Sequence, residues 1–256
     1  MIPALPEAFC RIPIAHRALH DAADGRPENS RAAMRAAIAA GYGIEIDLQL
    51  TRDGQALVFH DYDMARLTGQ QGAIRQRTAA EATQVALLHG DGETIPTLAE
   101  VLELVAGQVP LLVELKDQDG GMGPDIGALD AATAAALVGY QGPVAVMSFN
   151  PHSVAELARL APGVPRGLVT ESYVASDVPL SAATCDHLRE IPDFDRVGAG
   201  FISHEIHDLA RPRVQALRGS GVPVLCWTVR SPEAEAEARK YADNITFEGY
   251  LPPFPA

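Results

Sequence analysis

Apolar and polar residues alternate along residues 43–50, and this is the most informative pattern in the chain. The apolar side chains at positions 44, 46, 48 and 50 point to one face of the expected strand. Glu45, Asp47 and Gln49 point to the opposite face. The alternation therefore predicts a β-strand that carries two carboxylates on its polar face.

Asp53-Gly54 follows this strand, and this dipeptide is a strong hairpin signal. With a two-residue loop, opposed positions along the two arms sum to 107. The apolar residues 48 and 50 then face the apolar residues 59 and 57, and Asp47 faces His60. Two carboxylates and a histidine would share one polar surface, which suggests a metal site with an acid/base group beside it.

Strand-like and helix-like segments alternate along the rest of the chain. The expected helices cover residues 30–41, 97–105, 124–138, 151–160, 181–189, 211–219 and 232–241. The expected strands cover residues 12–15, 43–50, 110–114, 143–148, 165–170, 197–202, 222–228 and 245–248. Residues 56–60 are only the returning arm of the hairpin, because the link from residue 50 is too short for a parallel crossover.

Eight strands alternating with helices predict an α/β fold, a (β/α)8 TIM barrel. An open, doubly wound sheet is the alternative, although the glycine-rich phosphate loop expected after its first strand is absent. We expect a single domain over residues 1–256. A small insertion at about residues 62–92, with one short helix near residues 79–87, is expected to cap the site.

Composition and charge narrow the class of protein. The net charge of −13 argues against a nucleic-acid-binding surface and means that an anionic substrate must be attracted locally. No run of 18 apolar residues and no secretory signal is found, so we expect no membrane insertion. Cys10, Cys185 and Cys226 are widely spaced, which is typical of reduced thiols in a cytoplasmic protein. The oligomeric state stays open.

Charged residues gather at the ends of the first three barrel strands, where barrel enzymes carry their chemistry. The set contains two histidines, three carboxylates, one arginine and one lysine: His16, Arg17, Glu45, Asp47, His60, Glu114 and Lys116. The ends of later strands add Glu171, His204, Trp227 and Glu248, of which Trp227 is equally suited to core packing. The other histidines, His20, His89, His152, His187 and His207, are interpreted as structural.

The order of motifs resembles that of glycerophosphodiester phosphodiesterases. HRA and PENS come first, followed by GIEIDLQLTRDGQALVFHD, IPTLAEVL, VELK, SFN and WTV. The resemblance extends from His16 to about Trp227. It implies a (β/α)8 barrel that uses a divalent cation to hydrolyse glycerophosphodiesters to glycerol 3-phosphate and an alcohol. A related phosphodiesterase acting on lysophospholipids or other phosphodiesters is the alternative.

The resemblance also implies a role for each residue of the cluster. His16 and His60 would be the general acid/base pair, and Glu45, Asp47 and Glu114 the ligands of one cation. Arg17 and Lys116 would contact the phosphate, and Trp227 is a candidate for contact with the substrate. Carboxylate oxygens suit Mg²⁺ and Ca²⁺ equally, so the choice of ion stays open.

The chain departs from the family pattern at a few positions, of which those in the last strand and after WTV lie at the substrate rim. Ala18 and Ser30 replace a glycine and a threonine, which are changes between small residues. The last strand has TFEGYLP in place of T-D-x-P, and Arg230 replaces an asparagine. The alcohol preference is therefore left open.

Two hypotheses from other classes of protein remain. One is a glycosidase with paired carboxylates, whose activity would be insensitive to chelation, and the other is a catalytically silent barrel that serves as a binding protein.

Overall fold

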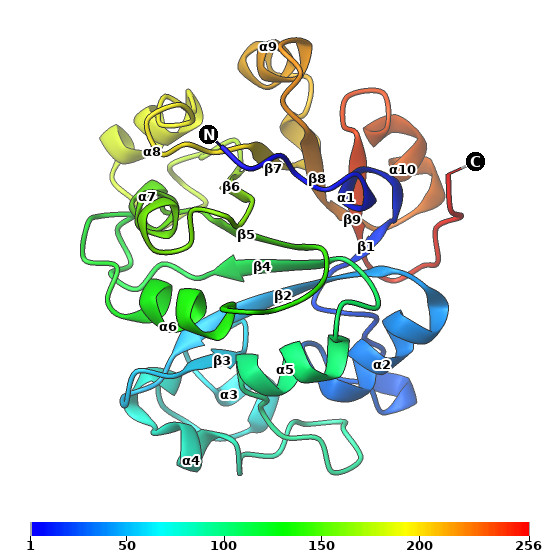
Figure 1. The fold of residues 1–256 in the computed structure, drawn as a ribbon, viewed down its shortest axis with the longest axis vertical. Helices are drawn as coiled ribbons and strands as arrows, with labels where there is room; N and C mark the ends of the chain where they lie inside the picture. Colours follow the sequence, from blue (N-terminus) through cyan, green and yellow to red (C-terminus); the bar gives the residue numbers. More distant parts are fainter. Residues whose placement is uncertain (1, 256) are drawn as a thin grey trace.

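The computed structural model describes residues 2–255, and its centre is a closed barrel of eight parallel strands, as the sequence predicts (Figure 1). The sheet order is β1-β9-β8-β7-β6-β5-β4-β2, and pairing of β1 with β2 closes it. The barrel strands are β1 (Ile14–Ala15), β2 (Gly43–Leu50), β4 (Leu111–Leu115), β5 (Val144–Ser148), β6 (Arg166–Thr170), β7 (Phe201–Glu205), β8 (Val224–Val229) and β9 (Asn244–Phe247). The antiparallel β3 (Ala56–Val58) pairs with β2 outside the closed ring.

Helices alternate with these strands around the barrel. The longer ones are α2 (Arg31–Ala40), α5 (Leu98–Val105), α6 (Leu129–Ala136), α7 (Pro151–Leu160), α8 (Ala182–Arg189), α9 (Pro212–Gly219) and α10 (Pro232–Ala238). The shorter ones are α1 (Ala8–Arg11), α3 (Ala65–Thr68) and α4 (Ala79–Ala82), with 3-10 turns at Ala22–Asp24, Ile74–Gln76 and Ile206–Asp208. Of these short elements, the sequence pattern indicated only α4.

Several helices begin at a residue whose side chain accepts a hydrogen bond from a backbone N–H of the first turn, which has no acceptor within the helix. Ser30 caps α2 through the N–H of Ala33, and Gly41 ends that helix in the left-handed region at φ 79°. Thr97 and Glu100 form a reciprocal capping box at the start of α5. These helix starts agree with the expected ones. By contrast α6 begins only at Leu129, five residues after the expected start, because a glycine-containing loop precedes it.

Alternation along β4 separates the two layers of the core. Val113 packs in the cluster between the strands and helices, and Leu112 packs in a second cluster with Phe9, Phe201 and other residues inside the barrel. Gly167 in β6 is required there, because a Cβ atom at this position would lie 2.5 Å from the Phe201 ring. The charged residues predicted to form the site lie towards the C-terminal ends of the strands, where barrel enzymes carry their chemistry.

The register of the hairpin differs from the expected one by one residue. Leu48 pairs with Val58, so opposed positions sum to 106. The loop has three residues instead of two: the N–H of Gly54 donates to the carbonyl of Thr51 (3.1 Å), and Gly54 has φ 79°. This is a type I turn followed by a left-handed residue. The carbonyl of Asp47 therefore accepts from Phe59 (2.9 Å), and the expected pairing with His60 is wrong.

The one-residue difference in register places each side chain of the returning strand on the face opposite the expected one. Ala56 and Val58 pack with Leu48 in the main core, whereas Leu57 and Phe59 pack under the insertion. Residues 56–59 are all apolar, and each face of this segment has its own apolar cover. Alternation therefore could not select the register from sequence.

The strand expected at residues 197–202 lies further along the chain, at Phe201–Glu205. Val197 and Ala199 are apolar because they fill a buried turn, in which Gly198 has φ 62° and donates to the carbonyl of Asp195. A buried turn with alternate apolar residues has the same pattern as a strand. The shift places His204 and Glu205 within β7.

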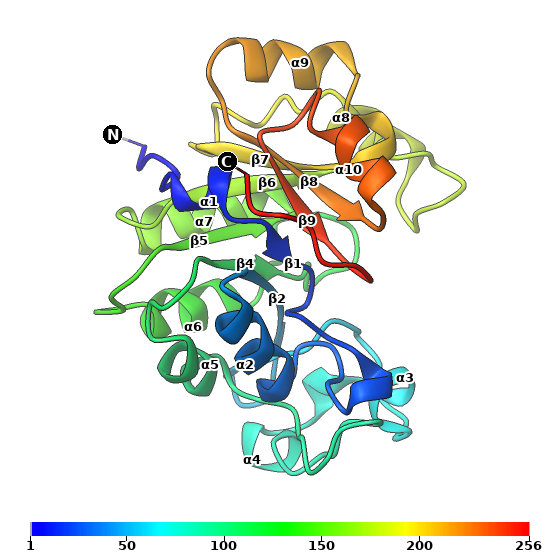
Figure 2. The same cartoon turned by 90° about the vertical axis from the view of Figure 1, so that its right-hand side faces the viewer.

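The insertion after the hairpin contains α3 and α4 and lies at one end of the molecule, opposite α9 (Figures 1 and 2). Its own apolar cluster includes Phe59, Met64, Leu67 and Ile74. Within residues 2–255 no helix is both long and apolar enough to cross a lipid bilayer.

Candidate active site

Three carboxylates meet at the mouth of the barrel. Glu45 and Asp47 come from β2, and Glu114 comes from β4, where its backbone is in register with that of Asp47. All three are buried, and one oxygen of each lies within 4.8 Å of the others. Parallel neighbours in register and two-residue spacing along β2 are sufficient to produce this cluster.

Glu45 has little compensation for its charge. Its Oε2 accepts from the backbone N–H of Arg17 (2.8 Å), which the left-handed conformations of Arg17 and Ala18 turn towards it. Burial, together with the neighbouring Asp47 and Glu114, raises the pKa of Glu45 well above its usual value. An added cation at this position would reverse that shift, which is the behaviour expected of a metal ligand.

Asp47 is the best compensated of the three carboxylates. Its Oδ2 accepts from the side-chain amide of Asn29 (2.9 Å), and its Oδ1 is 2.7 Å from the Lys116 ammonium. Burial raises the pKa of Asp47, but Lys116, His60 and Arg17 together hold it below its ordinary value. The sequence indicated Asn29 only as a helix cap, so its contact with Asp47 was missed.

Lys116 bonds two of the three carboxylates, one from each strand that contributes to the cluster. Its Nζ donates to Oε1 of Glu114 (2.5 Å) as well as to Asp47. The two carboxylates raise the pKa of Lys116 although burial opposes them, so the ammonium stays charged. The positive charge expected near a phosphate is present, and here it neutralises part of the carboxylate cluster.

His16 lies at the end of β1 and is fixed by a carboxylate from the opposite end of the chain. Its Nδ1–H donates to Oε2 of Glu248 (2.8 Å), and this bond lowers the pKa of Glu248 to about 2. Burial lowers the pKa of His16 itself. Glu248, which the sequence suggested only as a rim residue, therefore orients a predicted catalytic histidine.

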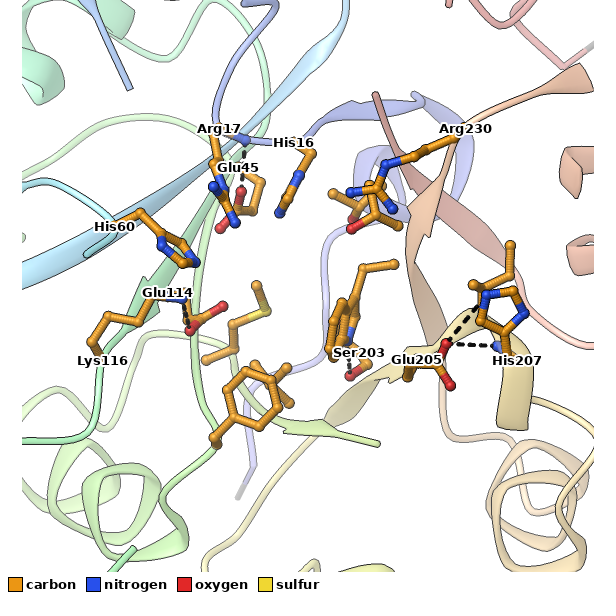
Figure 3. Close-up of a pocket in the computed structure, with 17 residues that line it drawn as sticks. His16, Arg17, Glu45, His60, Glu114, Lys116, Ser203, Glu205, His207 and Arg230 are labelled. Carbon is orange, nitrogen blue, oxygen red and sulfur yellow. Dashed lines mark hydrogen bonds and ion pairs between the residues drawn. The ribbon is translucent and has the colours of Figure 1, made fainter. Parts of the chain in front are cut away.

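His60 follows the returning strand and has a similar arrangement. Its Nδ1–H donates to Oδ1 of the adjacent Asp61 (2.7 Å), and Gln49 donates to the backbone carbonyl of His60. Figure 3 shows both imidazoles pointing into the same pocket, beside Glu45 and Glu114. Although the predicted hairpin register was wrong, His60 reaches the pocket because it lies beyond the last residue of β3.

The pocket is a cavity of about 380 Å³ that both histidines line with Arg17, Glu45, Glu114 and Lys116. Trp227 of β8 also lines the cavity, and its Nε1–H donates to the carbonyl of Ser203 (3.0 Å). Its ring makes an edge contact with that of Phe149, with centroids 5.6 Å apart. Every predicted site residue except Asp47 lines this pocket, and Asp47 lies directly behind it, bonded to Lys116.

Two of the predicted rim residues do not line the cavity, whereas one histidine predicted to be structural does. His204 is fully buried and bonded to Thr170, and Glu171 does not line the pocket. His207, interpreted as structural from the sequence, lies on the pocket wall with Glu205 and Arg230 (Figure 3). The shifted position of β7 explains the error, since it brings residues 205–207 to the strand end.

The sequence of this chain is similar to those of known phosphodiesterases. The sequence profile of the glycerophosphoryl diester phosphodiesterase family matches residues 16–245. A glycerophosphodiester phosphodiesterase from Caldanaerobacter subterraneus subsp. tengcongensis is 34% identical over 227 residues, which cover 86% of this chain and 87% of the relative.

Solved structures agree with the fold. A phosphodiesterase from Oleispira antarctica, in complex with the product sn-glycerol-3-phosphate, superposes with a TM-score of 0.72 at 25% identity and covers 91% of each chain. A putative glycerophosphoryl diester phosphodiesterase from Agrobacterium tumefaciens reaches a TM-score of 0.75 at 20% identity over 93% of each chain. The second match concerns the fold alone.

Proposed function

Since the chain belongs to the glycerophosphoryl diester phosphodiesterase family, we propose that it hydrolyses glycerophosphodiesters to glycerol 3-phosphate and an alcohol with a histidine pair and one divalent cation. The observation that supports this most strongly is the convergence of two carboxylate-anchored histidines with three buried carboxylates in one cavity. A glycosidase would need neither the second histidine nor Arg17.

Glu45, Asp47 and Glu114 would hold the cation. Their oxygens are hard ligands that suit Mg²⁺ or Ca²⁺, and the raised pKa values of Glu45 and Glu114 indicate negative charge that is not fully compensated. When bound, such an ion stabilises the negative charge that grows on a non-bridging phosphate oxygen.

The two imidazoles are arranged for proton transfer. A carboxylate at Nδ1 selects the tautomer of the neutral ring that carries its hydrogen on Nδ1, which leaves Nε2 able to accept a proton. In our proposal Nε2 of one histidine takes the proton of the nucleophile as its oxygen bonds to phosphorus. The other histidine, protonated, gives its proton to the alcohol oxygen as the second P–O bond breaks. Which histidine acts first stays open.

The nucleophile in this scheme is water or the neighbouring hydroxyl of the glycerol half. Arg17 supports phosphate binding, because its positively charged side chain lines the cavity together with both histidines. Lys116 supplies a second positive charge. These two local charges would attract the phosphate against the net charge of −13.

The wall around Trp227 would contact the carbon skeleton of the substrate. A lysophospholipid is the alternative substrate, since the same chemistry applies to any phosphodiester that enters the cavity. We also propose a cytoplasmic location for the enzyme, supported by three free cysteines of which two are buried.

The test is release of glycerol 3-phosphate from a panel of glycerophosphodiesters with different alcohols, with and without EDTA. We expect release by the wild type that the chelator abolishes, and a loss of about 100-fold or more in kcat for His60→Ala. His152→Ala is a matched control, because His152 is partly exposed at the start of α7 and outside the pocket. No release from any panel member by folded protein supplied with cation would contradict the proposed substrate class.

A further inference from the structure

Arg66 lies in α3 of the insertion and bonds two carboxylates at the same time. Its Nε and Nη2 donate to the two oxygens of Asp61, at 2.7 and 2.9 Å. Its Nη2 and Nη1 donate to the two oxygens of Glu28, at 2.7 and 2.8 Å. One guanidinium therefore makes four hydrogen bonds, two to each carboxylate, although about half of its side chain is exposed.

Each of these carboxylates in turn holds a residue of the active site. Asp61 accepts from Nδ1–H of His60 (2.7 Å), and Glu28 accepts from a guanidinium N–H of Arg17 (2.9 Å). A continuous chain of contacts thus runs from His60 through Asp61, Arg66 and Glu28 to Arg17. Arg66 itself lines neither the main cavity nor the adjoining groove beside His60 and Tyr62.

The charges along this chain support one another. Hydrogen bonds to Glu28 and Asp61 raise the pKa of Arg66. Burial raises the pKa of both carboxyls, but bonds from His60 to Asp61 and from Arg66 to both leave each pKa below its usual value. All three groups are ionised at neutral pH. Without Arg66 two neighbouring carboxylates would face each other with less compensation.

We propose that Arg66 is a positioning residue that sets the orientation of both the His60 ring and the Arg17 guanidinium, and that supplying it is a function of the insertion. This inference rests on the proposed phosphodiesterase function. It assigns to residues 62–92 a role different from the cap that the sequence predicts. A solvent-exposed ion pair alone would contribute little to stability and would not alter kcat.

The geometry also predicts which substitutions fail. Lysine carries the same charge, but a single ammonium cannot bond both oxygens of two carboxylates in fixed directions. Arg66→Lys should therefore recover only part of the function lost in Arg66→Met. Arg75→Met is the matched control, because Arg75 is exposed on the same insertion and has no side-chain hydrogen bond among residues 2–255.

The first experiment measures kcat, KM and Tm for these three variants on the best panel substrate. We expect Arg66→Met to lower kcat by about 10- to 100-fold, with a smaller loss for Arg66→Lys and none for Arg75→Met. A fourth variant, Arg66→Ala, tests chemical rescue. Methylguanidinium added at millimolar concentration should restore part of its kcat, since this cation can occupy the space that the side chain leaves between the two carboxylates. Wild-type kcat in Arg66→Met, or a loss that appears only in Tm, would overturn the inference.

The second experiment does not depend on activity, so failure of the proposed function remains distinguishable. Long-range ¹H–¹⁵N spectra of the imidazoles, with His60→Gln used to assign the His60 signals, report the ring nitrogens directly. Arg66→Met or Arg66→Lys should shift the signals of His60 and the Nε–H signal of Arg17, whereas Arg75→Met should not. Unchanged signals in both Arg66 variants would contradict the positioning role even if the wild type hydrolyses no panel member.

Discussion

Buried carboxylates illustrate how one residue type acquires different properties in this barrel. Asp47 lies beside the Lys116 ammonium and the Arg17 guanidinium, whereas Glu45 accepts a backbone N–H and has two carboxylates as neighbours. Asp130 is the contrasting case outside the site. It is buried in α6, its Oδ1 has no hydrogen-bond partner among residues 2–255, and its Oδ2 lies 3.5 Å from the Ser153 hydroxyl of α7. Burial raises the pKa of Asp130 to about 7.

Asp130→Asn should therefore stabilise the protein at alkaline pH. The folded pKa of about 7 exceeds the reference value of 3.8, so ionisation of Asp130 destabilises the fold progressively as the pH rises from 3.8 through 7. The gain from Asn should grow over this interval and level off above it, at roughly 2–4 kcal/mol. Thermal unfolding at pH 5 and pH 8.5 measures the difference.

Asp186→Asn is the control for this effect, because Asp186 is exposed and paired with Arg189 on α8. It should leave the pH dependence of Tm unchanged. A gain for Asp130→Asn that is the same at both pH values would contradict the argument from burial.

At the scale of elements, local chemistry predicted helix starts better than strand registers. A cap such as Thr97 with Glu100 acts within one turn, so a few residues contain the whole signal. The hairpin depended on what covers each face of the returning strand. Because the insertion buries Leu57 and Phe59, the wrong register satisfied the same sequence pattern.

Asp53→Gly discriminates between the two hairpin registers. A two-residue loop would require positive φ at both loop residues and would accept glycine, but the observed turn has positive φ only at Gly54. Asp53→Gly should lower Tm, because glycine loses more backbone entropy and the bond from the N–H of Ala79 to Asp53 disappears. An increase in Tm for Asp53→Gly would support the two-residue loop.

Gly54→Ala should lower the free energy of unfolding by about 1–2 kcal/mol, since the φ of 79° at this position is unfavourable for any side chain.

At the scale of the molecule, closure of the barrel concentrates charge that the chain otherwise disperses. Glu45, Asp47 and Glu114 are separated by up to 69 residues in sequence and lie within 4.8 Å at their oxygens. Lys116 offsets part of this charge. Folding thus assembles the three carboxylates of the proposed cation site, which the unfolded chain keeps apart.

Added Mg²⁺ or Ca²⁺ should therefore raise the Tm of EDTA-treated protein. At a concentration 100 times the Kd, binding to the folded state alone contributes about 2.7 kcal/mol. Glu45→Gln should remove most of this response, whereas Glu103→Gln, on the exposed side of α5, should retain it. A Tm that no divalent cation changes in the wild type would contradict the proposed metal site.

The sequence by itself determined the barrel, the strand that carries the carboxylates and the residues that meet at its mouth, because alternation, helix caps and short motifs are local signals. It also led to the family, since PENS, E-x-D and HD keep a recognisable order. Only the tertiary structure decided the hairpin register, the position of β7, and the partners Glu248, Asn29 and Arg66. These depend on contacts between segments distant in sequence, which packing and charge compensation select only after the barrel has closed.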